Sequence, residues 1–441
     1  MYLGNKGFTI LKSELKDINK VKRDLTATII SKNQPSTSVS FYRESHKKMY
    51  LPRYYGISHF GIPENRLSEG ENISLTFSGS LRPLQEKIVE SFIEKGNGLI
   101  EVGCGQGKTI CALNIIQRLG KKTLVVVHKE FLLNQWVERI AEFLPNARVG
   151  RIQGQNIDID KDIVIGMLQS LSMKEYNDSV FSSFGLIVFD EVHHISSEVF
   201  SNFLFKVVAN HMLGLSATME RKDGTTPFFK MFLGDVVYKQ TEKEVYNVIV
   251  RAYEYKNADP EFNEVEYDMR GNVKYSTMIT KLCSYNHRTE FVLNIIADLL
   301  KERPTNQIMV IAHNKSVLKY IYDAIASREM SSVGYYVGGM KEKDLKESEK
   351  KSVIIATYSM AAEALDIKTL TTLIMVTPKT DIEQAVGRIL REKHSSPIVV
   401  DIVDTHSLFK NQWKKRKTFY NSQKYKIEYM NFEKSKCEIK M

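Results

Sequence analysis

Short apolar runs alternate with stretches of helical periodicity from Ser80 almost to the end of the chain. One helical stretch, residues 109–119, is apolar at Leu113 and Ile116 and is stopped by Gly120. Apolar runs without polar alternation occupy residues 99–102, 124–127, 163–166, 186–189, 212–215, 308–311, 353–356, 373–376 and 398–402. Such strands separated by helices predict parallel sheets covered on both faces.

The pattern also predicts domain boundaries. Residues 1–75 show no strand–helix alternation, and we expect a small N-terminal accessory domain there. Residues 76–240 and 286–441 each carry a set of strands and helices, which predicts two tandem α/β domains. The polar, acidic stretch within 241–285 predicts a connector or insertion. The lysine-rich segment from Lys410 fits either a solvated helix and tail or a nucleic-acid contact.

Composition narrows the class of protein. A chain of 441 residues with 43% hydrophobic residues is large enough for two or three cores. The net charge of +10 favours polyanionic partners, although it also fits an ordinary basic protein. The four cysteines form neither a disulfide framework nor a metal-ligand spacing, and no run of about 18 apolar residues or signal-peptide core is visible. We therefore expect a cytoplasmic protein without a membrane segment. We also expect it to be a monomer.

A glycine-rich turn follows the first apolar strand and leads into a helix. It reads Gly-Cys-Gly-Gln-Gly-Lys-Thr, with Gly103, Gly105, Gly107, Lys108 and Thr109 as its informative positions. Backbone N–H groups of such a loop can surround phosphates, the lysine can reach the β and γ phosphates, and the threonine hydroxyl can ligate Mg²⁺. The usual pattern has one further glycine, where this chain has valine, so a plain glycine-rich turn remains an alternative for the loop alone.

Two acids end the apolar strand 186–189. Asp190 can hold a metal ion through water, and Glu191 can orient or deprotonate an attacking water. Paired acids at a strand end also occur as a charge preference of helix N-termini. Together with the upstream loop, however, they predict a site that binds ATP and Mg²⁺ and hydrolyses the nucleotide.

The second half of the chain carries two arginines, Arg388 and Arg391, that are three positions apart and would share a helix face. If the second sheet opposes the first, they can reach the γ-phosphate as arginine fingers. Surface arginines at this spacing are common. The pair therefore indicates a catalytic role only because the phosphate loop in the first half could form the other wall of the same cleft. Catalysis would then require the domains to close, and closure could move a bound strand.

At this point the residues resemble a family, the superfamily 2 helicases, in order from about Leu81 to Arg391. The resemblance implies two RecA-like domains. The matching segments are Arg82 and Gln85 (adenine-reading segment), 103–109 (motif I), 127–129 including His128, with Leu132, Gln135 and Trp136 (motif Ia), Gln169 and Ser170 (motif Ib), 190–193 (motif II), Ser216 and Thr218 (motif III), His313 with Asn314 (motif IV), Thr357 to Asp366 (motif V) and Gln384 to Arg391 (motif VI).

The resemblance implies roles for these residues. Catalysis is assigned to Lys108, Asp190, Glu191, Gln384, Arg388 and Arg391. Nucleotide binding is assigned to Arg82, Gln85, Gly103, Gly105, Gly107, Lys108, Thr109 and Asp366, with Thr109 and Asp190 on the metal. Nucleic-acid contact is assigned to His128, Gln169, Ser170, His313, Asn314 and Thr357, and coupling to His193, Ser216 and Thr218. Ala364 replaces the usual glycine of motif V, which weakens the transfer to Asp366.

Within the superfamily, the chain is similar to the XPB and UvsW group, and residues 42–56 look like the region before the core in helicases of large DNA viruses and T5-like phages. That likeness implies a DNA-stimulated ATPase that translocates 3′ to 5′ and acts on single-stranded and branched DNA or on stalled transcription complexes, inside the host cell if the protein is viral. The N-terminal stretch interleaves basic and aromatic residues, as a duplex-binding module would. They are Arg43, Lys47, Lys48, Tyr50, Arg53 and Tyr54.

Several functions share these features. The first is an ATP-driven DNA helicase that unwinds or remodels forks and Holliday junctions. The second is an RNA helicase or transcript-release factor, because contacts to phosphate barely distinguish the two sugars. The third is a clamp in which ATP only locks a conformation, which would not need both a water-aiming carboxylate and transition-state arginines. A nuclease is disfavoured because no second cluster of metal-ligand acids is visible.

Overall fold

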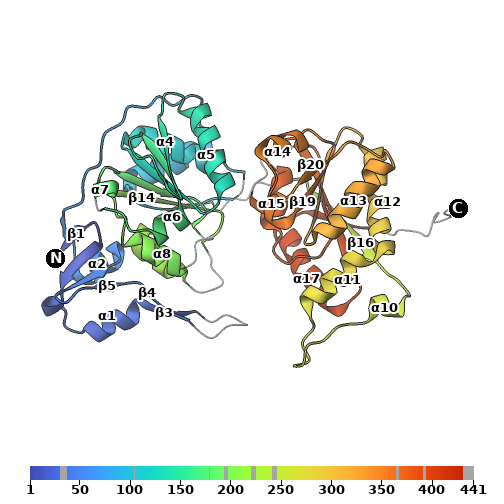
Figure 1. Cartoon of the computed structure of the whole chain (residues 1–441), viewed down its shortest axis with the longest axis horizontal. Coiled ribbons are helices and arrows are strands. Elements are labelled where there is room, and N and C mark those ends of the chain that lie inside the picture. The colour runs from blue at the N-terminus through green and yellow to red at the C-terminus, as the bar shows by residue number, and fades with distance from the viewer. Residues whose placement is uncertain are drawn as a thin grey trace. The chain divides into compact units, whose positions relative to one another are not determined.

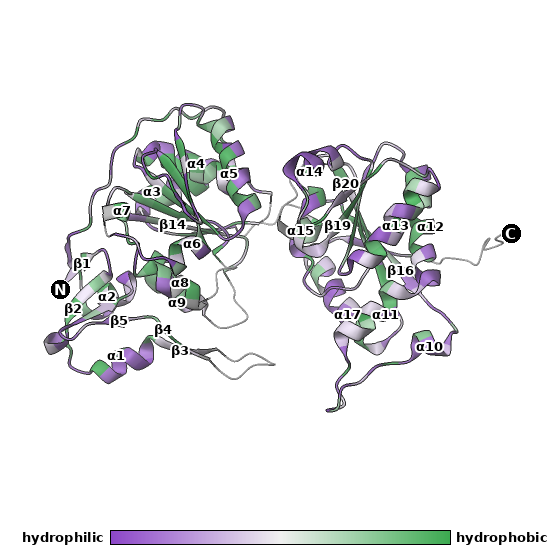
Figure 2. Ribbon diagram, in the orientation of Figure 1, coloured by the Kyte–Doolittle hydropathy of each residue, from purple (hydrophilic) through white to green (hydrophobic). Residues whose placement is uncertain are grey.

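The computed structural model describes residues 1–29, 37–103, 105–177, 179–192, 197–219, 225–240, 246–363, 367–390 and 394–430. The chain divides into two compact units, residues 1–241 and 242–441, which are described separately. Figure 1 shows a central sheet flanked by helices in each unit. In the figure coloured by hydropathy, the strands of both sheets are mainly apolar, whereas helices such as α1 (Ile18–Asp24) and α14 (Glu342–Ser348) are largely polar (Figure 2).

The first unit contains an eight-stranded sheet in the order β11-β10-β12-β9-β13-β14-β8-β15. Its neighbours are parallel except the pair β10 and β11. The strands are β8 (Gly98–Glu101), β9 (Thr123–Val127), β10 (Val149–Gln153), β11 (Asn156–Ile157), β12 (Ile163–Met167), β13 (Leu186–Phe189), β14 (His211–Ser216) and β15 (Val236–Lys239).

Helices cover both faces of this sheet. The helices are α3 (Pro83–Lys95), α4 (Lys108–Leu119), α5 (Glu130–Phe143), α6 (Leu168–Met173), α7 (Ser179–Ser182), α8 (Ser197–Leu204) and α9 (Thr226–Leu233). Strand β9 explains the unbroken apolar run, because every one of its residues is buried. Val125 and Val127 join the core beneath α3, α4 and α5, whereas Leu124 and Val126 join the core beneath α6, α8 and α9.

The N-terminal residues of the same unit form a separate five-stranded sheet in the order β5-β6-β2-β1-β7. Its elements are β1 (Tyr2–Gly4), β2 (Gly7–Leu11), the 3₁₀ helix η1 (Lys12–Glu14), α1, β5 (Arg43–Glu44), β6 (Lys48–Leu51), α2 (Arg53–Phe60) and β7 (Glu64–Asn65), with a hairpin of β3 (Thr26–Ile29) and β4 (Thr37–Ser40). We call residues 1–65 the N-terminal module. Its core is continuous with that of the larger sheet, since Phe41 stacks on Phe228 with ring centroids 4.1 Å apart.

The second unit contains a seven-stranded, wholly parallel sheet in the order β18-β19-β17-β20-β21-β16-β22. Its strands are β16 (Ile249–Tyr255), β17 (Gln307–Ala312), β18 (Val333–Tyr336), β19 (Val353–Thr357), β20 (Leu370–Met375), β21 (Ile398–Asp404) and β22 (Lys426–Met430). Its helices are α10 (Pro260–Asn263), α11 (Tyr275–Ser284), α12 (Asn286–Glu302), α13 (Lys315–Ser327), α14, α15 (Tyr358–Glu363), α16 (Glu383–Val386), η3 (Gly387–Leu390) and α17 (Ser407–Ser422).

These two parallel sheets confirm the predicted fold class of two tandem RecA-like α/β domains. The connector expected over 241–285 is wrong for β16, which lies between β21 and β22 inside the second sheet. Polar residues interrupt this strand; one of them, Arg251, is accommodated by a paired ion contact to Glu302, with N–O distances of 2.6 and 2.7 Å. The lysine-rich segment likewise contributes α17 and an edge strand, β22, to the domain.

Candidate functional site

Three neighbouring strands of the first sheet, β13, β14 and β8, end at one edge, which brings the predicted phosphate loop and acids together. The loop after β8 is tied to β14, because the N–H of Val102 donates to the Ser216 carbonyl at 3.1 Å. The N–H of Asp190 donates to the Val126 carbonyl of β9 at 3.0 Å. Open parallel sheets bind ligands beyond such carboxyl ends.

Glycine is required in the phosphate loop for conformational reasons. Gly105 and Gly107 have φ angles of 81° and 82°, in the left-handed region, and Gly107 is the N-cap of α4. A Cβ on Gly107 would also come within 2.2 Å of the Gln85 amide nitrogen. Lys108 follows as the first helical residue. The loop therefore ends at a helix N-terminus, where backbone N–H groups can receive phosphate.

Gln85 supports this loop through hydrogen bonds of its side-chain amide. Its side chain is buried; its Oε1 accepts the N–H of Arg82 at 2.9 Å, and its Nε2 donates to the carbonyl of Gln106 at 3.2 Å. Both ends of the amide are thus engaged with protein atoms. A second side chain, Gln240, accepts the N–H of Gly103 at 3.3 Å. The structure shows a loop-supporting role for Gln85, and adenine reading stays a prediction.

The acids and the loop lysine lie within contact distance. Lys108 Nζ is 3.2 Å from Glu191 Oε1, with both side chains largely shielded from solvent. Glu191 itself has a φ of 49°, which is unusual for a residue with a side chain. Asp190 is buried and accepts a hydrogen bond from the indole Nε1 of Trp136 at 2.9 Å. Burial, and next the charge of Glu191, raise the pKa of Asp190.

The donor set suits Mg²⁺. Asp190 and the hydroxyl of Thr109, in the first turn of α4, are hard oxygen ligands at the same sheet edge. Within the described residues no group of three or more His, Cys, Asp or Glu side chains could hold a metal on its own. Mg²⁺ is commonly held by one or two protein oxygens together with substrate phosphates and water, so the residues present fit that ion.

The segment after β14 closes on itself. Ser216 is buried, its hydroxyl donates to the Thr218 carbonyl, and the N–H of Thr218 returns to Ser216 Oγ at 3.3 Å. The next N–H, of Met219, donates to Glu101 Oε1 at 3.4 Å, at the end of β8. This turn therefore contacts the strand that carries the phosphate loop. His193, the third residue predicted to couple the sites, lies outside the described residues.

The predicted nucleic-acid residues of the first unit form a connected edge. Gln169 Nε2 donates to the carbonyl of His128 at 3.0 Å, and Ser170 Oγ accepts the N–H of Gly154 at 2.9 Å. Gln169 is exposed, while His128 and Ser170 are half-buried. The loops after β9 and β12 are thereby joined at the carboxyl edge of the sheet.

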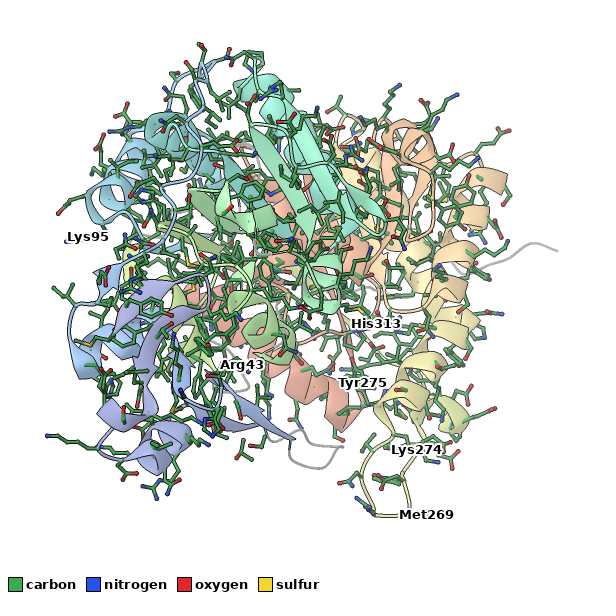
Figure 3. All side chains as sticks on the ribbon, turned by 60° about the vertical axis from the view of Figure 1, so that its left-hand side comes forward. Arg43, Lys95, Met269, Lys274, Tyr275 and His313 are labelled. Carbon is green, nitrogen blue, oxygen red and sulfur yellow. The ribbon has the colours of Figure 1, made fainter. Side chains whose placement is uncertain are left out.

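In the second unit, His313 lies in a polar and aromatic cluster at the end of β17. Thr377 Oγ1 accepts the N–H of His313 at 3.0 Å and lies 2.8 Å from its Nδ1. The rings of Tyr358 and Tyr275 have centroids 4.7 and 6.4 Å from the imidazole, and Figure 3 labels His313 and Tyr275. Burial, and then the charge of Lys379, lower the pKa of His313 to about 4. The imidazole is therefore neutral near neutral pH.

The other predicted residues of this unit are placed as follows. Asn314 is the N-cap of α13, and Thr357 Oγ1 is 3.2 Å from Ser359 Oγ. Gln384 is half-buried in α16, and Arg388 is buried in η3, where the backbone has changed from α to 3₁₀ geometry. Asp366 and Arg391 lie outside the described residues, and so does the helix face predicted to carry both arginines.

Arg53, predicted to contact nucleic acid, is half-buried and fixes the N-terminal module to the first sheet. Its Nη1 donates to the Asn210 carbonyl at 3.0 Å and the Ala209 carbonyl at 3.4 Å, and to Asn97 Oδ1 at 3.3 Å. Burial lowers its pKa, but an arginine remains charged at physiological pH. The geometry gives this side chain a structural role.

Residues 78–221 match the family described as type III restriction enzyme, res subunit, and residues 291–393 match the helicase conserved C-terminal domain. A protein of Acanthamoeba polyphaga mimivirus that carries the name of an ATP-dependent RNA helicase, L396, is 34% identical over 96% of this chain and 85% of its own length. The chain belongs to the superfamily 2 helicases. It is an ATP-dependent helicase and so binds nucleic acid.

Two further proteins are similar to this helicase. The protein D10 of Escherichia phage T5, which carries the name of a helicase, is 26% identical over 75% of this chain and 73% of its own length. The crystal structure of T4 UvsW matches 93% of this chain and 95% of its own length, at 16% identity and a TM-score of 0.36. None of the helices in the described part of the chain combines the length and the apolar composition of a membrane span.

Sequence reasoning missed three residues that shape the helicase sites. Trp136 was noticed only as part of motif Ia, yet it donates to Asp190. Gln240 supports the phosphate loop from a position 137 residues later, without any local signal. Thr377 follows β20 and completes the His313 cluster. A polar residue directly after a buried parallel strand is the one sequence signal that could have indicated Thr377.

Proposed function

We propose that this helicase hydrolyses ATP with Mg²⁺ in order to translocate on DNA in the 3′ to 5′ direction and to unwind or remodel branched duplexes such as forks and Holliday junctions. One observation carries the hydrolytic part. Lys108 and Glu191 lie 3.2 Å apart at the edge where the glycine loop and the acids of β13 converge. A phosphate group that enters this edge meets a cation, a helix N-terminus and a carboxylate able to orient water.

In this proposal each residue has a defined task. Lys108 pairs with the β and γ phosphates, and its ion pair with Glu191 breaks. The freed Glu191 carboxylate then orients or deprotonates the attacking water. Thr109 and Asp190 hold Mg²⁺, which supplies charge neutralisation at the phosphates when it is bound. Arg388, with Gln384 and Arg391, stabilises charge that develops in the transition state. Ser216, Thr218 and His193 couple the nucleotide-bound state of this site to the nucleic-acid contacts.

Nucleic acid would run along the loops that join the predicted contacts. In the first unit these are His128, Gln169 and Ser170, and in the second His313, Asn314 and Thr357. Their positions at carboxyl edges, together with hydroxyl, amide and imidazole groups, suit sequence-independent contacts to phosphate and sugar. A neutral His313 can donate one hydrogen bond to a phosphate without adding charge.

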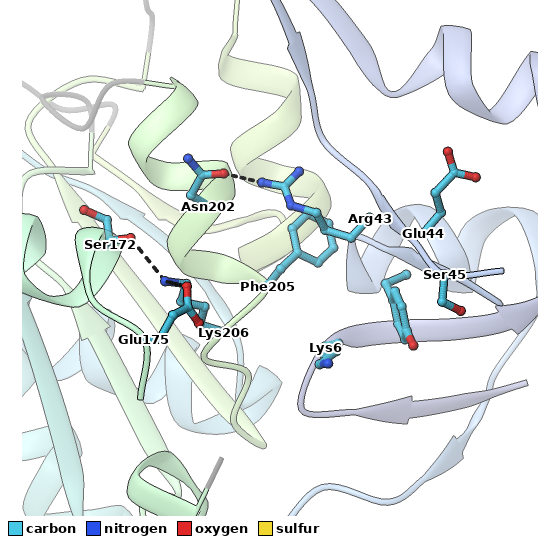
Figure 4. A pocket seen from close by; sticks show the side chains of 10 residues that line it. Lys6, Arg43, Glu44, Ser45, Ser172, Glu175, Asn202, Phe205 and Lys206 are labelled. Atoms are coloured by element: carbon cyan, nitrogen blue, oxygen red, sulfur yellow. Dashed lines mark hydrogen bonds and ion pairs between the residues drawn. The ribbon is translucent and has the colours of Figure 1, made fainter. Parts of the chain in front are cut away.

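The N-terminal module supports a preference for duplex or branched substrates. Residues 1–75, which include the module, hold twelve lysines and arginines against seven acids. A cavity of about 550 Å³ lies between the module and the region of α6 and α8 in the first unit (Figure 4). It is lined by Lys6, Arg43, Glu44, Ser45, Tyr50, Ser172, Glu175, Asn202, Phe205 and Lys206. Arg43 lies 5.1 Å from the Phe205 ring, and Lys6 lies 5.8 Å from the Tyr50 ring, so cations and aromatic rings are interleaved.

The second candidate is an RNA helicase or transcript-release factor. The observation in its favour is the name of the mimivirus relative, an ATP-dependent RNA helicase, and the same name occurs for a 28% identical protein of African swine fever virus. A clamp that uses ATP only to lock a conformation ranks third, because it does not need the water-orienting Glu191.

ATPase titrations with poly(dT), poly(U), blunt duplex, fork and Holliday-junction DNA test the proposal. We expect the largest stimulation with fork or junction DNA and unwinding that requires hydrolysable ATP. Stronger stimulation by poly(U) than by every DNA would favour the RNA helicase instead. Turnover that is equal with and without nucleic acid would exclude both.

A surface variant tests the N-terminal module separately. Lys6→Ala removes a cation from the rim of the cavity, while Lys95→Ala removes an exposed lysine at the end of α3 (Figure 3) and serves as the control. We expect Lys6→Ala to weaken fork binding and to reduce the salt dependence by about one counterion. Equal affinities of the two variants at all salt concentrations would remove the module from the nucleic-acid path.

A further inference from the structure

Helix α5 links the two functions of the first unit physically. It begins at Glu130, directly after His128 and Lys129, and its N-cap residue has no side-chain capping bond. The carbonyl of His128 is bound by Gln169, so the loop before α5 also belongs to the edge proposed to contact nucleic acid. A change at this loop therefore acts on the first turn of the helix.

Trp136 lies on the buried face of α5, in line with Leu132, Leu133 and Ile140. The ring is 1% exposed, and its Nε1 donates to Asp190 Oδ2 at 2.9 Å. The other buried side chains of this face are aliphatic and only fill space. The indole N–H adds a directed bond that any movement of α5 relative to β13 would strain.

Asp190, which accepts this bond, is held in place from two directions. It is buried beside Glu191, and its N–H is fixed to Val126 of β9, the strand that leads into the His128 loop. The carboxylate thus has a backbone anchored to β9 and an oxygen held by α5. One support comes from β9, which precedes the His128–Lys129 loop, and the other comes from α5, which follows it. Along the helix axis, Glu130 and Trp136 are only about 9 Å apart.

We propose that Trp136 is a positioning residue that couples the His128–Lys129 loop to Asp190, so that nucleic acid bound at this loop adjusts the carboxylate that holds Mg²⁺. The inference rests on the proposed function, since it takes the loop as a nucleic-acid contact and Asp190 as a metal ligand. It adds a route by which nucleic acid stimulates hydrolysis within one domain. The route uses a hydrogen bond between residues 54 positions apart.

Fluorescence offers a direct readout, because the chain has two tryptophans. In the Trp413→Phe variant of the whole chain, Trp136 is the only tryptophan, and because its indole N–H is bonded to Asp190 we expect its emission to respond to the charge and position of that carboxylate. We expect poly(dT) or fork DNA, without nucleotide, to change this emission with the same Kd as strand binding measured by anisotropy. Mg²⁺ with a non-hydrolysable ATP analogue should change it again. Unaltered emission at saturating nucleic acid would overturn the coupling.

The Trp136→Phe variant tests the consequence for turnover, because it keeps a buried ring and removes the donor. The ratio of turnover with nucleic acid to turnover without it should fall about fivefold or more, while strand affinity stays within about twofold. Trp413→Phe is the matched control and should retain the ratio. An unchanged ratio, or an equal loss of basal and stimulated turnover, would show that Trp136 only packs. If the variant does not fold, the fluorescence result decides alone, and absence of stimulation in the unaltered protein would instead contradict the proposed function.

Discussion

Lys108 and Glu191 form an ion pair of 3.2 Å, in which the lysine of the phosphate loop neutralises the carboxylate expected to aim water. In the proposed mechanism, a nucleotide replaces Glu191 as the partner of Lys108. Binding of the triphosphate would therefore release the carboxylate at the moment when water has to be oriented. The pair keeps two charges compensated in a largely enclosed site until that exchange occurs.

Two substitutions separate the roles of this pair. Lys108→Ala should abolish both tight ATP binding and turnover, because the phosphates lose their cation. Glu191→Gln should stop turnover while ATP and nucleic acid still bind, since the amide cannot take a proton from water. Equilibrium binding of a fluorescent ATP analogue, measured beside steady-state ATPase activity, distinguishes the two. Normal hydrolysis by Glu191→Gln would remove this residue from the mechanism.

Gly107 should tolerate no side chain. Gly107→Ala would place a methyl group 2.2 Å from the Gln85 amide at a φ of 82°. We expect a large rise in KM for ATP, because the loop must move away from Gln85. Gly154→Ala, at another positive φ but with open space around it, is the control and should leave KM unchanged. Similar KM values for the two variants would show that the loop conformation does not matter for binding.

Arg388→Ala should reduce the rate of hydrolysis by about 10³ or more, the order of effect of an arginine finger. ATP affinity should change far less, because the interaction develops in the transition state. Rapid-quench measurement of a single turnover checks this, with Arg328→Ala on the exposed pair to Glu290 as the control. Near-normal hydrolysis by Arg388→Ala would contradict the two-domain mechanism.

The pKa of His313 predicts a pH dependence of stability. Burial, and then Lys379, lower this pKa to about 4, whereas a histidine in the unfolded chain titrates near about 6.5. Between these values the unfolded state binds more protons, so stability falls as the pH drops from about 6.5 to about 4. In urea unfolding at several pH values, His313→Gln should lose part of this dependence, and the same change at the exposed His46 should not. Parallel curves for all three proteins would refute the shift.

Arg288 and Asp404 form a buried ion pair in the second unit, with N–O distances of 2.6 and 2.8 Å and no exposure of either side chain. Asp404→Ala leaves the guanidinium buried and uncompensated, which should cost about 3–5 kcal/mol of unfolding free energy. The exposed pair of Arg66 and Glu64 is the control, and Glu64→Ala should leave the unfolding free energy almost unchanged because water screens this pair. Urea unfolding followed by circular dichroism measures both.

The amino-acid sequence alone determined the fold class, and it located the glycine-rich loop and the acid pair. Each of these features can be recognised from residues that are close together in the sequence. An unbroken apolar run forms a buried parallel strand, and the glycine-rich loop and the acid pair follow strands β8 and β13 directly. Glycine permits the left-handed backbone at Gly105 and Gly107. The tertiary structure decided what supports them. Trp136 reaches Asp190 across 54 residues, Thr377 reaches His313 across 64, and β16 joins a sheet whose other strands begin 58 or more residues away, since it pairs with β21 and β22. Hydrogen bonds and sheet pairing between distant segments depend on how the strands are ordered in space, and that order leaves no periodic mark on the chain.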